Sequence, residues 1–416
     1  MNKDNTSGFC SQGHLLPEQV EIVEVDEAIR RIESCRALGE RLTRRLDEEV
    51  DADLGPRGER KEGVSGKLVC RKCGTQLRAK FRRNGGYRRQ IVTMEGVVTV
   101  RVPLIKCVCG GYATFPWKTL PPRARYWYDV VLHWERVYPT GPSYRKAAGL
   151  LSEATAIQVS HMSGWREMQK AGSAARAVKG AMTCPKVVLL DEMWVWEKGA
   201  QRAILLAMDV DGTILDSEGP TARSAENWRK LLERLSGRGV APDHGLRYVV
   251  ADGDASIRQA VEWVWGGAEL QHCVWHILAA VEAEAKKAFG AASHLVKDVV
   301  AEARAILLHD ERTAEAGVRA GERLAAFTRK HAGRPWADIV ARGFTQALTY
   351  LRSPWVPRTN STAERAIKEL RRRIKTMDGF KSHLGAKNCL AVLIQWYNWW
   401  RENHSPTMQR RCQVQP

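Results

Sequence analysis

The chain has 416 residues, which suggests two to four domains because a single hydrophobic core rarely organises so much chain. Its 65 Lys and Arg residues exceed its 47 Asp and Glu residues, and the formal net charge of +18 favours a polyanionic partner such as nucleic acid. No apolar run approaches the roughly 18 residues of a membrane span, and the first residues contain no hydrophobic signal segment. We therefore expect a cytoplasmic, nucleoid-associated protein without a membrane partner.

The N-terminal part combines a helical region with a β domain. Residues 1–66 are predicted to form one or two surface helices, followed by a linker at 55–66 that is rich in glycine and charge. From residue 67 the apolar period changes to two. Residues 67–118 are therefore predicted to form a β domain with a hairpin that turns at Glu95 and Gly96.

A cluster of four cysteines predicts a metal site in this β domain. Cys70-x-x-Cys73 is followed by one glycine and Cys107-x-Cys109 by two, so the chain can turn tightly around each pair. Such paired spacing is typical of a structural site with one tetrahedral zinc ion, and four reduced thiols are the alternative. Cys10 and His14 form a weaker pair. The domain is also predicted to contact DNA through its basic residues, namely Arg71, Lys72, Lys80, Arg82, Arg83, Arg88 and Arg89.

Residues 119–180 are predicted to be helical and to include a helix-turn-helix. A first helix breaks near residues 152–155, and a second helix is expected to start at Ala156. Gln158 and His161 are candidates for reading base edges in the major groove. A helical hairpin that only braces the next domain is the alternative. On the second helix we expect an outward face of Gln158, His161 and Trp165 and an inward face of Val159 and Met162.

The rest of the chain has the pattern of a mixed α/β domain, so the whole is expected to be multidomain α/β. Residues 181–276 show three strands, a helix, a strand, a helix and a last strand, which is the order of a ribonuclease H-like fold. Residues 277–355 are almost purely helical and would form an insertion. Residues 356–403 would be the final helical part of the catalytic core, and 404–416 a tail. Trp396, Trp399 and Trp400 recur at helical spacing, which predicts packing against the sheet.

Three acids stand where the predicted elements end or begin. Asp191 ends the apolar run KVVLL, Asp252 ends LRYVVA ahead of a glycine, and Glu364 opens the helix after Pro357. Carboxylates at the carboxyl ends of adjacent strands converge at one edge of a sheet. They suit Mg²⁺ or Mn²⁺, and two such ions can bracket a scissile phosphate. Taken singly, each acid could be a turn former or a helix cap. Neighbouring acids compete for the same roles: Glu192, Asp254 and Glu369.

Four motifs in this region resemble the catalytic domain of DDE transposases, most closely the Mutator-like group with its bacterial insertion-sequence members. The motifs are LLDEMWV, VVADGDASIRQAV, QHCVWHI and TNSTAERAIKELRRRIKTMDGF. The two aspartates lie 61 residues apart (252 − 191), and the glutamate follows 112 residues later (364 − 252). The resemblance implies DNA cleavage and strand transfer in a prokaryote, with Asp191, Asp252 and Glu364 as the metal-binding triad.

The motif QHCVWHI carries the Cys-x-x-His signature of that family at Cys273 and His276. If the last strand ran beside the first, His276 would lie near the triad and could bind a phosphate or orient a ligand. A plain structural histidine is the alternative, and Cys273 is expected to be buried. On the final helix, Lys368, Arg371 and Lys375 share the face of Glu364 and are predicted to line the DNA backbone, unless they form only a solvated stripe.

The pattern as a whole predicts a transposase that binds the terminal inverted repeats of its element and joins them to target DNA. Pairing two ends requires at least a homodimer on DNA. A nuclease of the same fold without strand transfer, a transposase-derived DNA-binding regulator and a pure interaction module are the alternatives. The three intact acids argue against the last two.

Overall fold

The computed structural model describes residues 17–404 apart from 58, 60, 121–124, 142, 178–179 and 378. The pair Cys10 and His14 and the tail beyond residue 404 lie outside the described residues. The chain separates into two compact units. Unit 1 consists of residues up to 134 together with 144–164, and unit 2 consists of residues 135–143 together with 165 onward.

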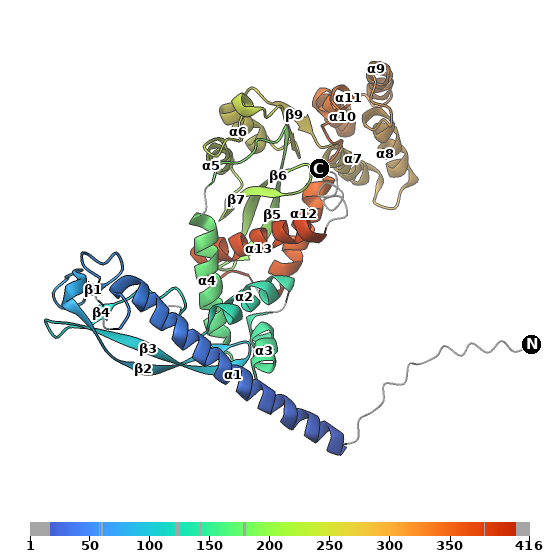
Figure 1. Ribbon diagram of the computed structural model, residues 1–416. Coiled ribbons are helices and arrows are strands. Elements are labelled where there is room, and N and C mark those ends of the chain that lie inside the picture. Colours follow the sequence, from blue (N-terminus) through green and yellow to red (C-terminus); the bar gives the residue numbers. More distant parts are fainter. Residues whose placement is uncertain are drawn as a thin grey trace, which may run out of the picture. The chain divides into compact units, whose positions relative to one another are not determined.

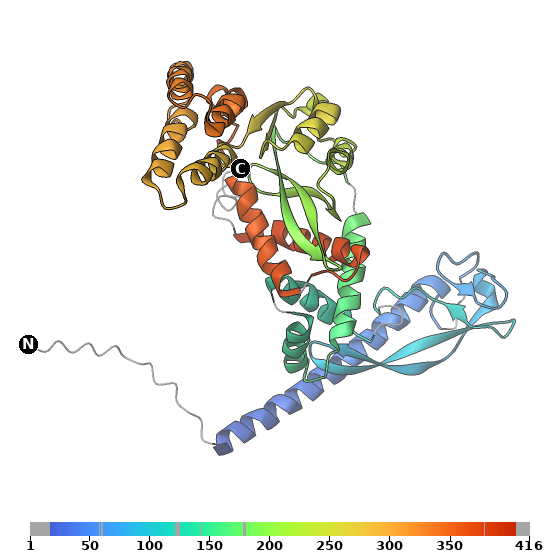
Figure 2. The ribbon, with the colours of Figure 1, turned by 180° about the vertical axis from the view of Figure 1, so that it is seen from behind.

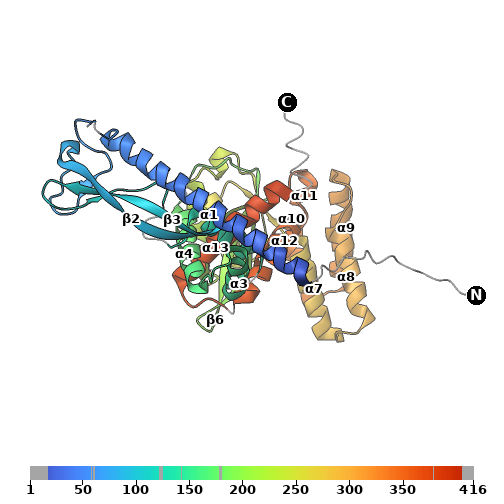
Figure 3. The same ribbon diagram turned by 60° about the horizontal axis from the view of Figure 1, so that its bottom comes forward.

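Unit 1 is built on one long helix and one long hairpin. Helix α1 (Pro17–Leu54) lies along the antiparallel pair of β2 (Phe81–Thr93) and β3 (Gly96–Cys107), as Figures 1 and 3 show. Leu42 and Leu46 of α1 are buried against Ile91, Val98 and other apolar residues of the hairpin. The predicted turn at Glu95 and Gly96 is confirmed, because Thr93 pairs with Gly96 and Gly96 has a φ of 131°.

Shorter elements complete unit 1. Strands β1 (Val69–Cys70) and β4 (Ala113–Thr114) form a second, two-stranded sheet, and the 3-10 turn η1 (Arg78–Lys80) precedes β2. Helix α3 (Tyr144–Thr155) is also part of the unit. Two helices, α2 (Tyr128–Val137) and α4 (His161–Ala177), begin in unit 1 and end in unit 2, and the 3-10 turn η2 (Tyr138–Thr140) belongs to unit 2.

The second helix of the predicted helix-turn-helix begins five residues later than expected. Ala156 has a φ of 54°, a left-handed conformation that ends α3, and α4 starts only at His161. Gln158 therefore lies in the connecting loop. Met162, predicted to face inward, is 44% exposed, whereas Val159 is buried as predicted. The later start changes which residues face the core.

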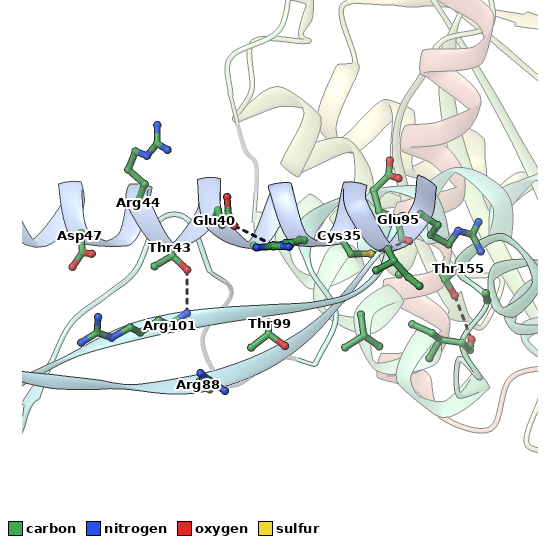
Figure 4. A pocket seen from close by; sticks show the side chains of 18 residues that line it. Cys35, Glu40, Thr43, Arg44, Asp47, Arg88, Glu95, Thr99, Arg101 and Thr155 are labelled. Carbon is green, nitrogen blue, oxygen red and sulfur yellow. Dashed lines mark hydrogen bonds and ion pairs between the residues drawn. The ribbon is translucent and has the colours of Figure 1, made fainter. Parts of the chain in front are cut away.

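An open groove of about 1200 Å³ lies in unit 1 between α1 and the hairpin (Figure 4). The Arg101 N–H donates to Thr43 Oγ1 at 3.1 Å, which ties β3 to α1. Ile32 and Val97 line the groove and are 68% and 42% exposed. Arg88 adds an exposed cation from β2. The groove thus presents apolar and basic side chains together.

Unit 2 contains a five-stranded mixed sheet in the order β7-β6-β5-β8-β9. Strand β6 pairs antiparallel with both β5 and β7, while β8 is parallel to β5 and to β9. The predicted order of strands and helices along the chain is confirmed, and the fold is mixed α/β. The strands are β5 (Val187–Glu197), β6 (Ala200–Asp209), β7 (Ile214–Thr221), β8 (Tyr248–Ala251) and β9 (Glu269–His272).

Helices cover this sheet because its apolar strands need burial on both faces. Helices α5 (Ala225–Ser236) and α6 (Ala255–Trp265) bury Trp228 and Trp265 against it, and the 3-10 turn η3 (Pro242–His244) follows α5. Helix α12 (Ser361–Ile374) packs on β5 and α13 (His383–His404) on β7, with the 3-10 turn η4 (Lys375–Met377) between them. Figure 2 shows these helices around the sheet from behind.

A bundle of helices follows β9 and precedes α12, in the region where the sequence predicted a helical insertion (Figure 3). Gln271 of β9 fixes the bundle to the sheet, because its side-chain Nε2 donates to Ala347 O at 2.7 Å and its Oε1 accepts from Tyr350 N at 3.1 Å. In the part of the chain that the structure describes, no helix has both the length and the apolar character needed to cross a bilayer. The bundle consists of α7 (Val274–Phe289), α8 (His294–Leu307), α9 (Ala314–Lys330), α10 (Pro335–Ala347) and α11 (Thr349–Arg352).

The tryptophans of α13 do not all pack as predicted. Trp399 and Trp400 are 48% and 41% exposed, and the buried face of the helix is formed instead by residues such as Leu393 and Tyr397. Trp396 is half-buried and stacks on Trp400 with ring centroids 6.4 Å apart. Helical spacing alone placed the stripe on the wrong side of α13.

Candidate active site and cysteine cluster

The three predicted acids come from three elements of unit 2. Leu189 of β5 pairs with Val250 of the parallel strand β8, so Asp191 and Asp252 each lie two residues beyond this pair. Because side chains alternate along a strand, equal offsets from a pair place both acids on the same face and at the same level. Glu364 lies in the first turn of α12, the helix that packs on β5.

Asp191 does not end its strand, contrary to the prediction. It is the fifth residue of β5 and pairs with Leu206 of β6. The strand continues because β6 extends alongside it as far as Glu197, whereas β8 pairs with β5 only up to Leu189. Asp191 therefore lies just beyond the point where β5 and β8 stop pairing, and its side chain is buried.

The expectation that the last strand runs beside the first is wrong, because β8 lies between β9 and β5. Strand β9 ends at His272, so Cys273 and His276 belong to the start of α7 instead of to the strand. The turn into α7 nevertheless brings them to the acids. Possible ligand atoms of Cys273, His276 and Glu364 all lie within 4.8 Å of one another.

Burial and mutual repulsion dominate the electrostatics of the site. Burial, followed by the carboxylates of Asp252 and Glu364, raises the pKa of Asp191 to about 6, although the Glu192 backbone N–H and His276 oppose this shift. Burial likewise raises the pKa of Glu192 to about 7 against the opposing effect of Arg223. A cation bound nearby would favour the ionised form of these buried carboxylates.

His276 carries part of the compensating positive charge. Its pKa is raised to about 9, first by the interaction of its side chain with Cys273 and further by Asp191 and Asp252, against the opposing effect of burial. The imidazole is therefore protonated at neutral pH. Its buried Nδ1 has no hydrogen-bond partner among the described residues. Cys273 is fully buried, as predicted.

Asn360 was missed by sequence reasoning and holds Asp191 in place. It is fully buried one residue ahead of α12, and its Nδ2 donates to Leu190 O at 3.0 Å and to Asp191 Oδ2 at 3.1 Å. Its backbone N–H donates to Cys273 Sγ at 3.2 Å. An Asn before a helix normally suggests a cap, but this side chain makes no capping bond. Its buried Oδ1 lacks a hydrogen-bond partner in the described structure.

Arg223 was also missed, and it connects three of the acids. It stands between β7 and α5, and its guanidinium lies 2.8 Å from Glu192, 2.7 Å from Asp252 and 3.3 Å from Asp254. No local sequence signal distinguishes this arginine from the many others. Asp254, a competitor for a catalytic role, instead caps α6 by accepting from Ser256 N at 2.8 Å.

Gly253 permits the close approach behind Asp252. It has a φ of 85°, and a Cβ at this position would collide with the His272 ring. His272 Nε2 lies 2.6 Å from Asp252 O, and burial lowers the pKa of this histidine. The predicted tight turn after Asp252 thus also leaves space for the imidazole ring of His272.

Most of the remaining predicted DNA contacts are exposed, but Arg83 and Arg89 of β2 are only partly exposed, and Arg83 is ion-paired with Asp47 and Asp51. Lys368 and Arg371 project from α12, and Lys375 follows in the 3-10 turn η4. In unit 1, Gln158 is exposed in its loop and His161 is exposed at the first residue of α4. Their accessibility is compatible with DNA contact.

The four clustered cysteines come together in unit 1. Cys70 Sγ lies 3.5 Å from Cys109 Sγ, and Cys73 Sγ lies 3.8 Å from Cys107 Sγ. A tetrahedral zinc ion with Zn–S bonds of about 2.3 Å places its sulfurs about 3.8 Å apart, whereas a disulfide needs about 2.05 Å. A hydrogen bond from the Cys73 backbone lowers the pKa of the Cys70 thiol to about 6, which favours the thiolate form. The cluster therefore fits a metal ion and could bind zinc.

Comparison with known proteins defines the class. Residues 69–402 match the family model described as "Transposase, Mutator family", which is a family of transposases. Because the match extends over most of its length, the chain belongs to the Mutator family, as the resemblance of its motifs predicted.

One curated relative is the transposase for insertion sequence element IS406 of Burkholderia multivorans (strain ATCC 17616 / 249). It is 26% identical over 202 residues, and the match spans 46% of this chain and about half, 49%, of the relative's own length. A chain of the simian T-cell lymphotropic virus intasome in complex with PP2A regulatory subunit B56 gamma matches at 7% identity over 47% of this chain and 63% of that chain. Its TM-score of 0.18 is too low to carry an argument.

Proposed function

We propose that this chain is a metal-dependent DDE transposase that cleaves DNA at the ends of its element and joins those ends to target DNA. The observation that supports this most strongly is that Asp191 and Asp252 lie at the same level of adjacent strands and that the carboxylates of Asp252 and Glu364 are near enough to raise the pKa of Asp191. Membership of the Mutator family supplies the reaction class.

The proposal includes a ribonuclease H-like catalytic core. Three antiparallel strands followed by two parallel ones, in the order β7-β6-β5-β8-β9, support it. In this core the acids would hold Mg²⁺ or Mn²⁺, as two ions. Bound there, such ions would polarise the scissile phosphate and activate the attacking hydroxyl. The pKa of Asp191, raised to about 6, and the unpartnered Oδ1 of buried Asn360 support a cation among these residues.

The neighbouring side chains of the chain would position the reacting groups. Asn360 Nδ2 donates to Asp191 Oδ2 and Glu192 N donates to Asp191 Oδ1 at 2.7 Å, so each carboxylate oxygen keeps a further lone pair for a metal ion. His276 has its pKa raised to about 9 beside Cys273, Asp191 and Asp252, so its imidazolium is suited to donate to a phosphate oxygen bound at the acids. Lys368, Arg371 and Lys375 would bind the DNA backbone beside the site.

DNA recognition would involve unit 1. We propose one zinc ion at the four cysteines as a structural support for a DNA-binding domain at 67–118, and base contacts from Gln158 and His161 in the region 119–180. The proposed catalytic core comprises residues 181–276 and 356–403, with the helical insertion 277–355 between them and a tail at 404–416. Two element ends must be held together during strand transfer, so a homodimer or larger assembly on DNA is part of the proposal.

The test uses purified full-length protein and a plasmid that carries the DNA flanking its own gene. Asp191→Asn, Asp252→Asn and Glu364→Gln should each abolish Mg²⁺-dependent cleavage while DNA binding in a gel-shift assay is retained, because one missing carboxylate leaves the metal ions incompletely bound. Glu369→Gln is the matched control and should keep its activity. Normal cleavage by any of the three variants would refute the assignment.

Strand transfer needs its own measurement. Oligonucleotides that represent pre-cut ends should be joined to a target plasmid by the wild-type protein. Cleavage without joining would favour the nuclease of the same fold, and DNA binding without either reaction would favour the regulator.

A further inference from the structure

Arg223 lies at the centre of the acidic site but has no part in the proposed chemistry. Its Nε is 2.8 Å from Glu192 Oε1, and its Nη2 is 2.7 Å from Asp252 Oδ2 and 3.3 Å from Asp254 Oδ2. About a third of the side chain, 31%, is exposed. One guanidinium thus bridges three carboxylates that come from two strands and a helix cap.

The position of Arg223 is fixed by its neighbours. Ser224 directly follows it and caps α5 by accepting from Asn227 N, and Asp254 is held as the cap of α6. Arg223 therefore lies next to the N-terminus of α5, and its partner Asp254 lies at the N-terminus of α6. A planar guanidinium with several donors suits such a site better than a lysine does.

Charge in the site is unbalanced without a further cation. Five acids meet here, and Arg223 contacts three of them directly, namely Glu192, Asp252 and Asp254. The five acids are Asp191, Glu192, Asp252, Asp254 and Glu364.

Asp252 is the acid for which Arg223 and a metal ion would compete. Its Oδ1 already accepts from Asp254 N at 2.9 Å, and its Oδ2 accepts from Arg223 at 2.7 Å. A divalent cation at Oδ1 would therefore lie near the Asp254 N–H that already donates to this oxygen. A cation at Oδ2 would lie near the positive charge of Arg223. The unpartnered Oε2 of Glu192 shows that Arg223 does not satisfy all the acids it contacts.

We propose that Arg223 is an internal counter-ion of the acidic site, which holds Glu192 and Asp252 in place while no divalent cation is bound and competes with that cation for Asp252. This inference rests on the proposed metal site. It makes Arg223 a positioning residue whose removal has two opposite effects. The metal-free protein becomes less stable, and divalent cations bind more tightly.

The experiment compares Arg223→Gln with wild type and with Arg234→Gln in the full-length protein. Arg234 is the matched control, because it bridges Asp216 and Glu218 of the same unit in a similar way but touches none of the five acids. Mn²⁺ affinity is measured by titration calorimetry at one pH, and melting temperature is measured in EDTA and in saturating Mn²⁺.

Arg223→Gln should bind Mn²⁺ about fivefold more tightly or better, the lower end of typical coupling between two sites. It should melt lower than wild type in EDTA, and saturating Mn²⁺ should narrow that gap. Arg234→Gln should also melt lower but keep its Mn²⁺ affinity. Arg223→Lys keeps the charge without the fork and provides a folded variant of intermediate affinity if the glutamine variant does not fold.

Unchanged or weaker Mn²⁺ binding by both Arg223 variants would overturn the counter-ion role while leaving the metal site intact. Absence of Mn²⁺ binding by the wild-type protein would instead overturn the proposed function and this inference with it. The two failures are therefore distinguishable.

Discussion

Replacing Asn360 with Ala should weaken both unit 2 and the metal site proposed for it. The substitution removes two hydrogen bonds, at 3.0 Å to Leu190 O and 3.1 Å to Asp191 Oδ2. A bond to a neutral acceptor contributes about 0.5–1.5 kcal/mol and one to a charged acceptor about 1.5–3 kcal/mol. We therefore expect the free energy of unfolding to fall by about 2–4.5 kcal/mol at a pH where Asp191 is ionised.

The expected loss depends on pH in a defined direction. The bond to Asn360 favours the ionised form of Asp191, whose pKa is about 6, so Asn360→Ala raises that pKa further. When a carboxyl has a higher pKa in the folded than in the unfolded state, the free energy of unfolding falls as pH rises toward the folded-state pKa. Urea unfolding should therefore show a larger cost for Asn360→Ala at pH 8 than at pH 5.

Asn398 offers a matched control for this experiment. Its side chain also makes two bonds, both at 2.9 Å to the backbone of Ile214, but it contacts no acid of the site. Asn398→Ala should cost about 1–3 kcal/mol at either pH and leave Mn²⁺ affinity unchanged. Equal costs for Asn360→Ala at pH 5 and pH 8, with unaltered Mn²⁺ affinity, would refute the role given to Asn360.

Two further predictions concern the four clustered cysteines and the Cys273–His276 motif. Elemental analysis should find about one zinc ion per chain, and Cys73→Ser should lower both the zinc content and the melting temperature, since metal binding and folding are coupled in such sites. Zinc-free protein with an unchanged melting curve would contradict this. His276→Ala should reduce cleavage strongly with little change in stability. Cys273→Ser should mainly lower stability, because a buried hydroxyl replaces a packed thiol. Parallel losses in both variants would identify the Cys273–His276 motif as structural.

The sequence predicts those parts of the site that have local signals. Asp252 stands between an apolar run and a glycine, and its place directly after β8 follows from that pattern. Asp191 shows the limit of such reasoning. The pair Asp191 and Glu192 resembles a strand terminator, yet β5 continues to Glu197 because β6 pairs with it throughout. The length of β5 depends on its pairing with β6, which the local sequence around Asp191 does not predict.

Asn360 and Arg223 could not be predicted for a related reason. Each acts only through residues far along the chain, Asn360 on Asp191 and Arg223 on Asp252. Their local context suggests a helix cap and one basic residue among 65 Lys and Arg. Spatial proximity, and not residue type, gives them their roles.

The helical insertion between β9 and α12 has a consequence for synthesis. Glu364 follows Asp252 by 112 residues, and a bacterial ribosome adds about 5–20 residues per second, so roughly 6–22 s separate the two acids. During that interval a nascent chain has its basic N-terminal unit and both aspartates but neither Asn360 nor Glu364. On the proposed function, products that stop within the insertion would keep the proposed DNA-binding unit without the complete set of acids, and abundant incomplete chains would compete with the full-length protein for DNA.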